Sequence, residues 1–303
     1  MVGRACEGVA LMTAVITDDN VVSPYRELMA YECIYATEGT SRARVSRLIS
    51  EGGGLPSRAL RSMEGFVPNE QKHQEVGEYV GSRLGGFSIL VEGTPQFPSG
   101  LRSQRDPLPV FYYRGDLTLL DSRCVSIVGT RRPSGRGVSA ARRLAHALAA
   151  RKITVVMGLA AGVDTEAARG ALEAGGRVIG VIGTPIDRYY PRENRDLQDQ
   201  VASKGLLISQ VPIYHYDHQP FKTQRFYFPE RNVTMAALSE ATVIVEAGET
   251  SGTRTQARAC LEQGRGLILL PQVVDETSWG RGLLARGAVE ARTVRDVLDE
   301  IGE

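Results

Sequence analysis

Short apolar runs that alternate with amphipathic helical stretches constrain the fold more than any other feature of this chain. From residue 124 onward the apolar runs recur as CVSIVG, ITVVMG, RVIGVIG, GLLIS, ATVIVEAG and GLILLP. Helical stretches such as GVSAARRLAHALAARK and GVDTEAARGALEAGG separate most of them. Runs that are apolar throughout are typical of parallel strands in a sheet covered by helices on both faces. The pattern therefore predicts an α/β fold with a doubly wound, mostly parallel sheet.

The sequence before this region has a helical period instead. From Ser23, a good N-cap, apolar residues recur three and four positions apart, and the glycines at 52–54 end the second helical stretch. The third stretch begins at Pro56 and the fourth at Asn69. The β-rich runs FSILV and VFYYRG then lead into the alternating region. We predict three regions: an irregular or disordered N-terminus (1–22), a small helical domain (23–86) and the α/β domain (87–303).

Composition indicates an ordinary globular protein. Apolar residues make up 42% of the chain and charged residues 23%, which argues against a disordered or membrane-embedded protein. The 36 basic and 35 acidic residues leave a net charge of +1, so any nucleic-acid binding must come from a local basic patch. No apolar run approaches the ~20 residues of a membrane helix. Four scattered cysteines without C-x-x-C pairs predict reduced thiols in a cytoplasmic protein and no metal site.

Glycine, hydroxyl and arginine residues follow several of the predicted strands. The carboxyl ends of parallel strands meet at one edge of a sheet, where ligands bind in doubly wound folds. Glycines let a ligand approach the backbone, helix N-termini offer N–H groups, and arginine or hydroxyl donors suit phosphate oxygens. These turns predict a phosphate-bearing ligand. The candidate residues are Gly129, Thr130, Arg131, Arg132, Ser134, Gly158, Gly162, Asp164, Glu246, Ser251, Gly252 and Thr253.

These residues also have a purely structural interpretation. A glycine after a strand is explained by a tight turn alone, Asp164 by capping of the following helix, and Arg132 by a solvated turn. The convergence of four glycine-bearing turns on one edge of the sheet favours the ligand.

Cations and aromatic rings alternate in a second informative stretch, FKTQRFYFPERN at 221–232. We predict that it is non-helical and closed by Pro229. Cations that neutralise phosphates and rings that stack on unpaired bases together suit single-stranded nucleic acid. The alternative is an ordinary hydrophobic lid with solvated charges. The candidate residues are Lys222, Arg225, Phe228, Arg231 and Asn232.

Several distinctive motifs follow one another in the α/β region: VSIVGTRRPSGRG, MGLAAGVDTEAARGALEAGG, VIGTPIDRYYPRENRDL, FPERN and VIVEAGETSGTRTQARACLEQGR. In this order, over about residues 97–300, they resemble the DprA/Smf family of DNA-processing proteins. The resemblance implies an extended Rossmann fold that forms a homodimer and binds single-stranded DNA. It further implies transfer of that DNA to a RecA-type recombinase in natural transformation, with no cofactor and no catalysed reaction.

The resemblance assigns the family's phosphate pocket to the strand-end residues, with Arg225 holding a phosphate and Phe228 stacking a base. The chain departs from the family motifs at Ala161 and Val233, where arginine is usual, at Ala168, where histidine is usual, and at Glu230, where a basic residue is common. A groove that loses cations and gains a carboxylate is expected to bind DNA more weakly, with a shallower salt dependence.

Other functions stay open at this point. Divergence from the family also fits a phage-defence role, as an antitoxin with a toxin partner. Related Rossmann proteins of the phosphoribohydrolase type act on nucleotides through a catalytic glutamate, but Gln256 occupies that position, and an amide cannot serve as a general base. A nucleotide-binding sensor or such an enzyme is the alternative to DNA binding, and a protein-binding module is the third reading. We expect a non-enzymatic protein.

Overall fold

The computed structural model describes residues 22–37, 39–63, 70–102 and 104–303, so the N-terminus predicted to be irregular lies outside it apart from Val22. Ser23 precedes the first helix as its N-cap, and Gly52 follows the second as its C-cap, as the sequence predicts. Asn69, the predicted start of the fourth helix, lies outside the described residues. The helices that come first in the described chain are α2 (Pro24–Tyr35), α3 (Arg42–Glu51), α4 (Pro56–Ser62) and α5 (Glu70–Gly81).

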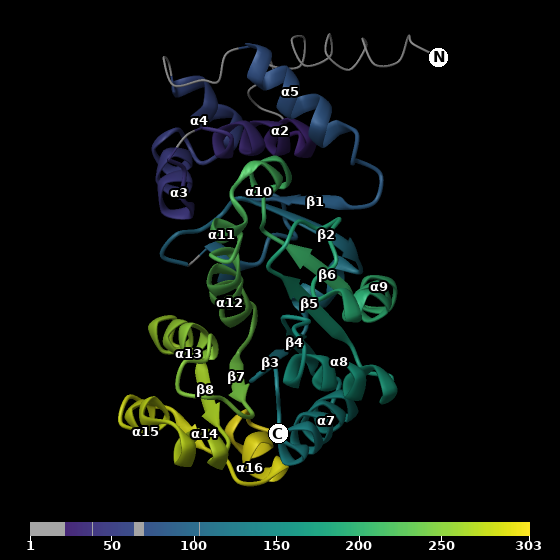
Figure 1. Cartoon of the computed structure of the whole chain (residues 1–303), viewed down its shortest axis with the longest axis vertical. Coiled ribbons are helices and arrows are strands. Elements are labelled where there is room, and N and C mark those ends of the chain that lie inside the picture. Colours follow the sequence, from purple (N-terminus) through teal and green to yellow (C-terminus); the bar gives the residue numbers. More distant parts are fainter. Residues whose placement is uncertain (1–21, 38, 64–69, 103) are drawn as a thin grey trace.

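Nine strands of the described chain form one sheet in the order β1-β2-β6-β5-β4-β3-β7-β8-β9 (Figure 1). β2 runs antiparallel to β1 and to β6, whereas the pairings from β6 through to β9 are parallel. The predicted α/β fold with a mostly parallel sheet is confirmed. The strands are β1 (Ser88–Val91), β2 (Val110–Gly115), β3 (Cys124–Val128), β4 (Thr154–Met157), β5 (Val178–Ile182), β6 (Leu206–Ser209), β7 (Ala241–Ile244), β8 (Gly266–Leu269) and β9 (Val289–Glu290).

The order in which the chain adds strands to the sheet reverses at β3. Strands β4, β5 and β6 are added on one side of β3, and β7, β8 and β9 on the other. The order β5-β4-β3-β7-β8-β9 is that of the Rossmann fold. Ile127 of β3 lies opposite Val243 of β7. The switch point between β3 and β7 is where a sheet of this kind opens a crevice for ligands.

Helices cover both faces of the sheet because each has one apolar face. In Figure 1, α8 and α9 lie on one side of the central strands, and α12 and α13 lie on the other. α7 buries Ala141, Leu144, Ala145 and Leu148 at helical spacing. The bounds are α6 (Ser99–Arg102), α7 (Gly135–Ala150), α8 (Val163–Glu173), α9 (Arg195–Lys204), α10 (Ile213–His218), α11 (Phe221–Gln224), α12 (Tyr227–Leu238), α13 (Thr253–Glu262), α14 (Pro271–Glu276), α15 (Ser278–Leu284) and α16 (Val294–Glu300), with 3-10 helices η2 (Leu117–Asp121) and η3 (Arg192–Asn194).

The stretch 221–232 differs from its prediction because it is largely helical. It contains all of α11 and the first half of α12. Pro229 is the third residue of α12 and so lies in its first turn, where the missing N–H leaves no helical hydrogen bond unmade. The prediction of a non-helical stretch closed by this proline was wrong.

The N-terminal helices pack at the end of the sheet that carries β1 and β2 (Figure 1). Glu32 of α2 is fully buried there, and its carboxylate accepts hydrogen bonds from the Tyr112 hydroxyl and from the backbone N–H groups of Ile213 (2.7 Å) and Tyr214 (3.0 Å). Burial raises the pKa of Glu32 to about 7. Buried apolar residues of these helices and of the sheet form one continuous cluster. The division into two domains stays a prediction.

No helix within the described residues has the length and apolar character needed to cross a membrane. The same part of the chain contains no group of three or more side chains placed to hold a metal ion. Cys33, Cys124 and Cys260 are buried thiols, and burial raises the pKa of Cys33 to about 12 and of the other two to about 11. Such thiols are unreactive at neutral pH.

Candidate nucleic-acid interface

A cavity of about 560 Å³ lies at the switch point, where the ends of β3 and β7 meet the N-terminal parts of α12 and α13. The two strand ends are joined directly, because the Thr130 N–H donates to the Glu246 carbonyl (2.7 Å). Tyr190, Gly248 and Thr250 line the cavity without having been predicted. The predicted residues that line it are Gly129, Thr130, Arg131, Asp164, Arg225, Phe228, Arg231, Asn232, Ser251, Gly252 and Thr253.

Two aromatic rings and a guanidinium group form one wall of this cavity. The ring centroids of Tyr190 and Phe228 are 5.1 Å apart. The Arg131 guanidinium lies 5.6 Å from the Phe228 centroid and 5.9 Å from the Tyr190 centroid. Gly183 makes room for the Phe228 ring, since a Cβ there would lie 2.6 Å from its Cδ1 atom. Rings beside a cation match what a nucleotide base and its phosphate require.

Sequence reasoning missed Tyr190 although the residue stands in a motif that it singled out, VIGTPIDRYYPRENRDL. The signal was the aromatic pair before Pro191, in the loop that follows β5. This loop is long, and the residues directly after the strand are glycine, threonine and proline. Only the fold shows that the loop returns to the switch point.

The N-terminus of α13 forms another wall. The Asn232 side chain donates from Nδ2 to the Gly252 carbonyl (3.1 Å) and so ties this turn to α12. The hydroxyl oxygens of Ser251 and Thr253 lie 2.9 Å apart beside it. Arg225, between α11 and α12, is exposed and lines the same cavity. A helix N-terminus with hydroxyl and guanidinium donors is suited to an anion.

Arg231 lines the cavity but is engaged in structural contacts. It is only 5% exposed, and its Nη1 donates to the carbonyls of Gly158 and of Val181 (2.8 Å). Burial lowers the pKa of Arg231 to about 10 and raises that of the neighbouring Asp164, which accepts a hydrogen bond from the Gly158 N–H (2.9 Å). Arg231 therefore fastens α12 to the ends of β4 and β5.

The space beside most of the predicted glycines is filled by the protein itself. A Cβ on Gly158 would lie 1.7 Å from the Arg231 guanidinium, and one on Gly129 or Gly162 would come within 2.6 Å of neighbouring atoms. These three glycines serve internal packing, which differs from the expectation that they open the backbone to a ligand. Gly252 differs from these three, because a Cβ added there would meet no atom within 4 Å.

The N-terminus of α7 was expected to receive phosphate and instead receives one of the protein's own carboxylates. Glu246 accepts hydrogen bonds from the Ser134 N–H (2.9 Å) and the Ser134 hydroxyl (2.7 Å), and the same hydroxyl accepts from the Gly137 N–H (3.2 Å). Neither Ser134 nor Glu246 lines the cavity, and Arg132 and Lys222 are exposed outside it.

The four departures from the family motifs add no carboxylate to the cavity. Glu230 does not line it, and burial raises the pKa of this side chain. Val233 packs against the core, Ala168 is fully buried and Ala161 is exposed. The expected weakening of DNA binding therefore rests on lost cations alone.

Gln256 is 1% exposed and also lines the cavity. Its Nε2 donates to the Thr242 hydroxyl (3.2 Å), and its Oε1 has no hydrogen-bond partner within the described part of the chain. The nearby Glu249 accepts from the Ser278 N–H (2.9 Å) and is turned to α15. An unpaired buried oxygen at a cavity marks a place where a ligand donor would be favourable.

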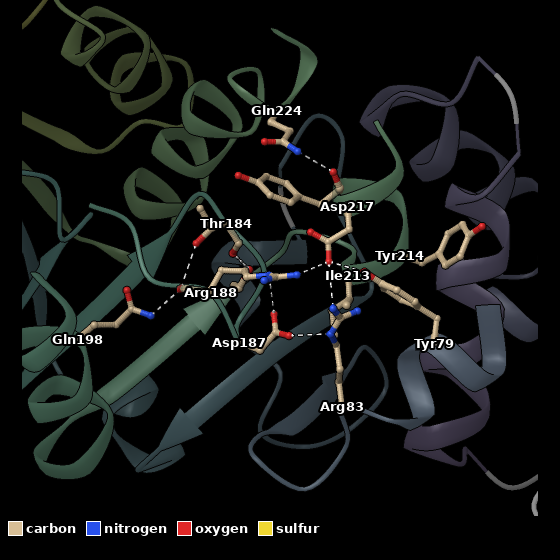
Figure 2. Close-up of polar contacts among 12 residues, drawn as sticks. Tyr79, Arg83, Thr184, Asp187, Arg188, Gln198, Ile213, Tyr214, Asp217 and Gln224 are labelled. Atoms are coloured by element: carbon tan, nitrogen blue, oxygen red, sulfur yellow. Dashed lines mark hydrogen bonds and ion pairs between the residues drawn. The ribbon is translucent and has the colours of Figure 1, made fainter. Parts of the chain in front are cut away.

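An ion-pair network fixes the segments that carry the aromatic wall (Figure 2). Asp217 of α10 accepts hydrogen bonds from the Tyr79 hydroxyl (2.8 Å) and from Arg188 Nη2 (2.7 Å), and Arg83 Nη2 lies 3.4 Å away. Arg83 also pairs with Asp187 (3.1 Å) and stacks 4.0 Å from the Tyr79 centroid. The network connects the end of α5, the loop after β5 and α10, which leads into α11 and α12.

Residues 88–302 match the sequence profile of a family described as DNA recombination-mediator protein A. The DNA processing protein DprA of Bacillus subtilis is 34% identical over 221 residues, which cover 72% of this chain and 72% of that protein. Protein Smf of Synechocystis is 34% identical over 263 residues, which cover 80% of this chain and 63% of that protein.

Two solved structures are similar in fold. The X-ray structure of DNA processing protein A from Streptococcus pneumoniae superposes with a TM-score of 0.74 at 26% identity, over 92% of this chain and 98% of that one. DNA processing protein A from Helicobacter pylori, whose structure describes a single-stranded DNA binding mode, gives a TM-score of 0.61 at 30% identity. That match covers 71% of this chain and 95% of the Helicobacter chain.

Proposed function

Because the chain belongs to the DNA recombination-mediator protein A family, we propose that it binds single-stranded DNA in the cavity at the switch point. The observation that carries this proposal is the convergence of Arg131, Arg225, Phe228 and Tyr190 on one cavity. The two guanidinium groups face phosphates, and the two rings stack on bases. The site acts by binding and catalyses no reaction.

Unpaired bases fit this site better than a duplex does. Phe228 and Tyr190 line the cavity side by side, and a base stacks on such rings only when it is not stacked in a double helix. The net charge of +1 makes the attraction local to the cations of this edge. The Helicobacter relative, which binds single-stranded DNA, supports the same ligand for this chain.

The relatives are named for DNA processing, which supports a cellular role of this kind. We place this protein in recombination, as a homodimer that delivers single-stranded DNA to a RecA-type recombinase, with natural transformation as the setting. A phage-defence role beside a toxin partner uses the same DNA site. Light scattering of the purified chain gives its oligomeric state, and a pull-down with a RecA-type recombinase tests the recombination partner.

Fluorescence anisotropy with a labelled oligo-dT strand tests the function. We expect saturable binding of the single strand at low salt and at least tenfold weaker binding of a duplex of the same length. Phe228→Ala weakens binding by about tenfold, because one base–ring stack is worth about 1–3 kcal/mol. Absence of binding to the single strand at low salt would remove the proposed function.

A nucleotide is the second candidate ligand, and two buried atoms favour it. Gln256 Oε1 and Arg231 Nε have no partner among the described residues, and both side chains line the cavity. Both atoms are inaccessible, so a base or sugar hydroxyl satisfies them only if the two side chains turn toward the cavity. A thermal-shift screen of nucleotides followed by product analysis tests this candidate; stabilisation without turnover indicates a sensor, and turnover contradicts the non-enzymatic function.

A further inference from the structure

Two phenylalanine rings stand exposed beside the cavity. Phe221 is 86% exposed and Phe226 is 58% exposed, and neither lines the cavity. Phe221 begins α11, and Phe226 lies between α11 and α12. Two rings this exposed, five residues apart in sequence, make the segment a candidate binding surface.

The backbone that carries these rings is anchored by its neighbours. Tyr227 is buried, and its hydroxyl accepts a hydrogen bond from Gln219 Nε2 (3.3 Å). Gln224 Nε2 donates to the Tyr216 carbonyl (2.9 Å), a contact drawn in Figure 2. The buried residues of the segment therefore hold it in place, and the two phenylalanines are left to face solvent.

Two cations accompany the rings, and one of them also belongs to the cavity. The Arg225 guanidinium lies 5.4 Å from the Phe226 centroid and lines the cavity, and Lys222 is exposed. No acidic residue occurs between positions 218 and 229. The preceding carboxylate, Asp217, is paired with Arg188. The segment 218–229 therefore carries Lys222 and Arg225 without a carboxylate of its own, and Arg225 links Phe226 to the cavity.

From this arrangement, and resting on the proposed function, we infer that Phe221, Lys222 and Phe226 form a second single-stranded DNA subsite, the outer platform. Bases that leave the cavity stack on the two rings, Lys222 neutralises a phosphate between them, and Arg225 is shared by both subsites. Cations interleaved with ring faces are the surface that single strands follow.

A second copy of this chain fits the outer platform less well. Most soluble homodimers are two-fold symmetric, so an interface centred here would bring Lys222 and Arg225 against the same residues of the other copy. Like charges at such short range are unfavourable, whereas the phosphates of a strand are attracted by both.

Strand length tests the outer platform separately from the cavity. Anisotropy titrations compare a short oligo-dT of about 4 nucleotides with a long one of about 16 nucleotides, the lower and upper site sizes of single-strand-binding OB folds. Phe221→Ala/Phe226→Ala is expected to bind the short strand as the unchanged protein does and the long strand about tenfold more weakly. Phe221→Leu/Phe226→Leu, the leucine pair, is expected to lose the same affinity as the alanine pair, because stacking requires a ring. Phe221→Trp/Phe226→Trp, which keeps a ring at both positions, is expected to retain long-strand binding. Tyr25→Ala, an exposed aromatic on α2, is the matched control and changes neither affinity.

Lys222→Ala adds an independent readout, because it lowers the salt slope of long-strand binding by about 0.7 and leaves the short-strand slope unchanged. Three results would overturn the outer platform and leave the cavity site standing. The alanine pair could lose affinity equally for both strand lengths, it could lose affinity for neither, or the leucine pair could bind the long strand as tightly as the unchanged protein does. If the alanine pair shifts from dimer to monomer in light scattering and loses affinity equally for both strands, the rings belong to a subunit contact. This result would overturn the outer platform too. Failure of the unchanged protein to bind the short and the long strand removes the proposed function and this subsite together.

Discussion

Arginine has two different roles at this cavity, and burial separates them. Arg131 and Arg225 are exposed and stand beside aromatic rings, whereas Arg231 is buried against two backbone carbonyls. The sequence shows three arginines in family motifs and does not distinguish them, because the distinction depends on which of them the fold buries. Burial lowers the pKa of Arg231 to about 10, as expected for an arginine whose role is structural.

Substitution of these arginines separates stability from binding. Arg231→Ala leaves the carbonyls of Gly158 and Val181 without their donor and is expected to lower the free energy of unfolding by about 2–4 kcal/mol. Arg131→Ala, at an exposed position, changes it by less than about 0.5 kcal/mol and weakens binding of single-stranded DNA. Urea unfolding and anisotropy of both variants check this; equal unfolding free energies would contradict the assignment.

Glycine positions give a second test at the residue scale. Gly252→Ala is expected to leave the unfolding free energy within about 0.5 kcal/mol, since the Cβ site is open, and to weaken DNA binding by crowding the cavity. Gly158→Ala is the contrasting variant, because its Cβ would collide with Arg231 and cost about 1–3 kcal/mol of stability. Thermal unfolding with anisotropy measures both effects. Loss of stability in Gly252→Ala would show that this glycine too is structural.

Individual elements differ in how well their sequence determines them. Strands β3, β4 and β5 are buried throughout and mostly apolar, and they were predicted because burial on both faces leaves a local pattern. α11 and α12 were missed, because Pro229 and the mixture of rings and cations look like a loop until the proline is placed in a first turn. The network around Asp217 had no local signal, since Tyr79 and Arg83 lie far away in sequence.

Capping of α7 supplies a prediction for an element. Glu246→Ala removes the acceptor of the N–H and hydroxyl of Ser134, the N-cap of α7, and is expected to lower the unfolding free energy by about 1 kcal/mol, the usual net value of a hydrogen bond. Affinity for single-stranded DNA is not reduced, because neither residue lines the cavity. Chemical denaturation and anisotropy of this variant test the point. A tenfold loss of affinity for single-stranded DNA at unchanged stability would instead place Ser134 and Glu246 in the phosphate site.

At the scale of the whole molecule, the strand order explains where the site lies. Alternating strands and helices predicted the parallel sheet, and the sheet order places the ends of β3 and β7 together at a switch point. Tyr190 reaches the cavity from the loop after β5, and Tyr79 and Arg83 contact α10 and that loop, through long-range contacts that a single sequence does not reveal. The fold was therefore more predictable than the arrangement of side chains around the cavity.

The junction between the N-terminal helices and the sheet predicts a pH dependence of stability. Burial raises the pKa of Glu32 from 4.5 to about 7, so the folded state holds a proton that the unfolded chain releases between these pH values. This contribution to stability is full below about pH 4.5 and is lost as the pH rises to about 7, at up to about 1.4 kcal/mol per pH unit. The difference in unfolding free energy between the unchanged protein and Glu32→Gln should fall across this window. A difference independent of pH would contradict it.

The salt dependence of DNA binding by Arg131→Ala/Arg225→Ala tests the central claim most directly. Each cation that neutralises a phosphate of a single strand contributes about 0.7 to the slope of log affinity against log salt. The double variant should therefore bind oligo-dT at least tenfold more weakly than the unchanged protein, with a slope smaller by about 1.4. An unchanged affinity and an unchanged slope would show that the strand does not pass through this cavity.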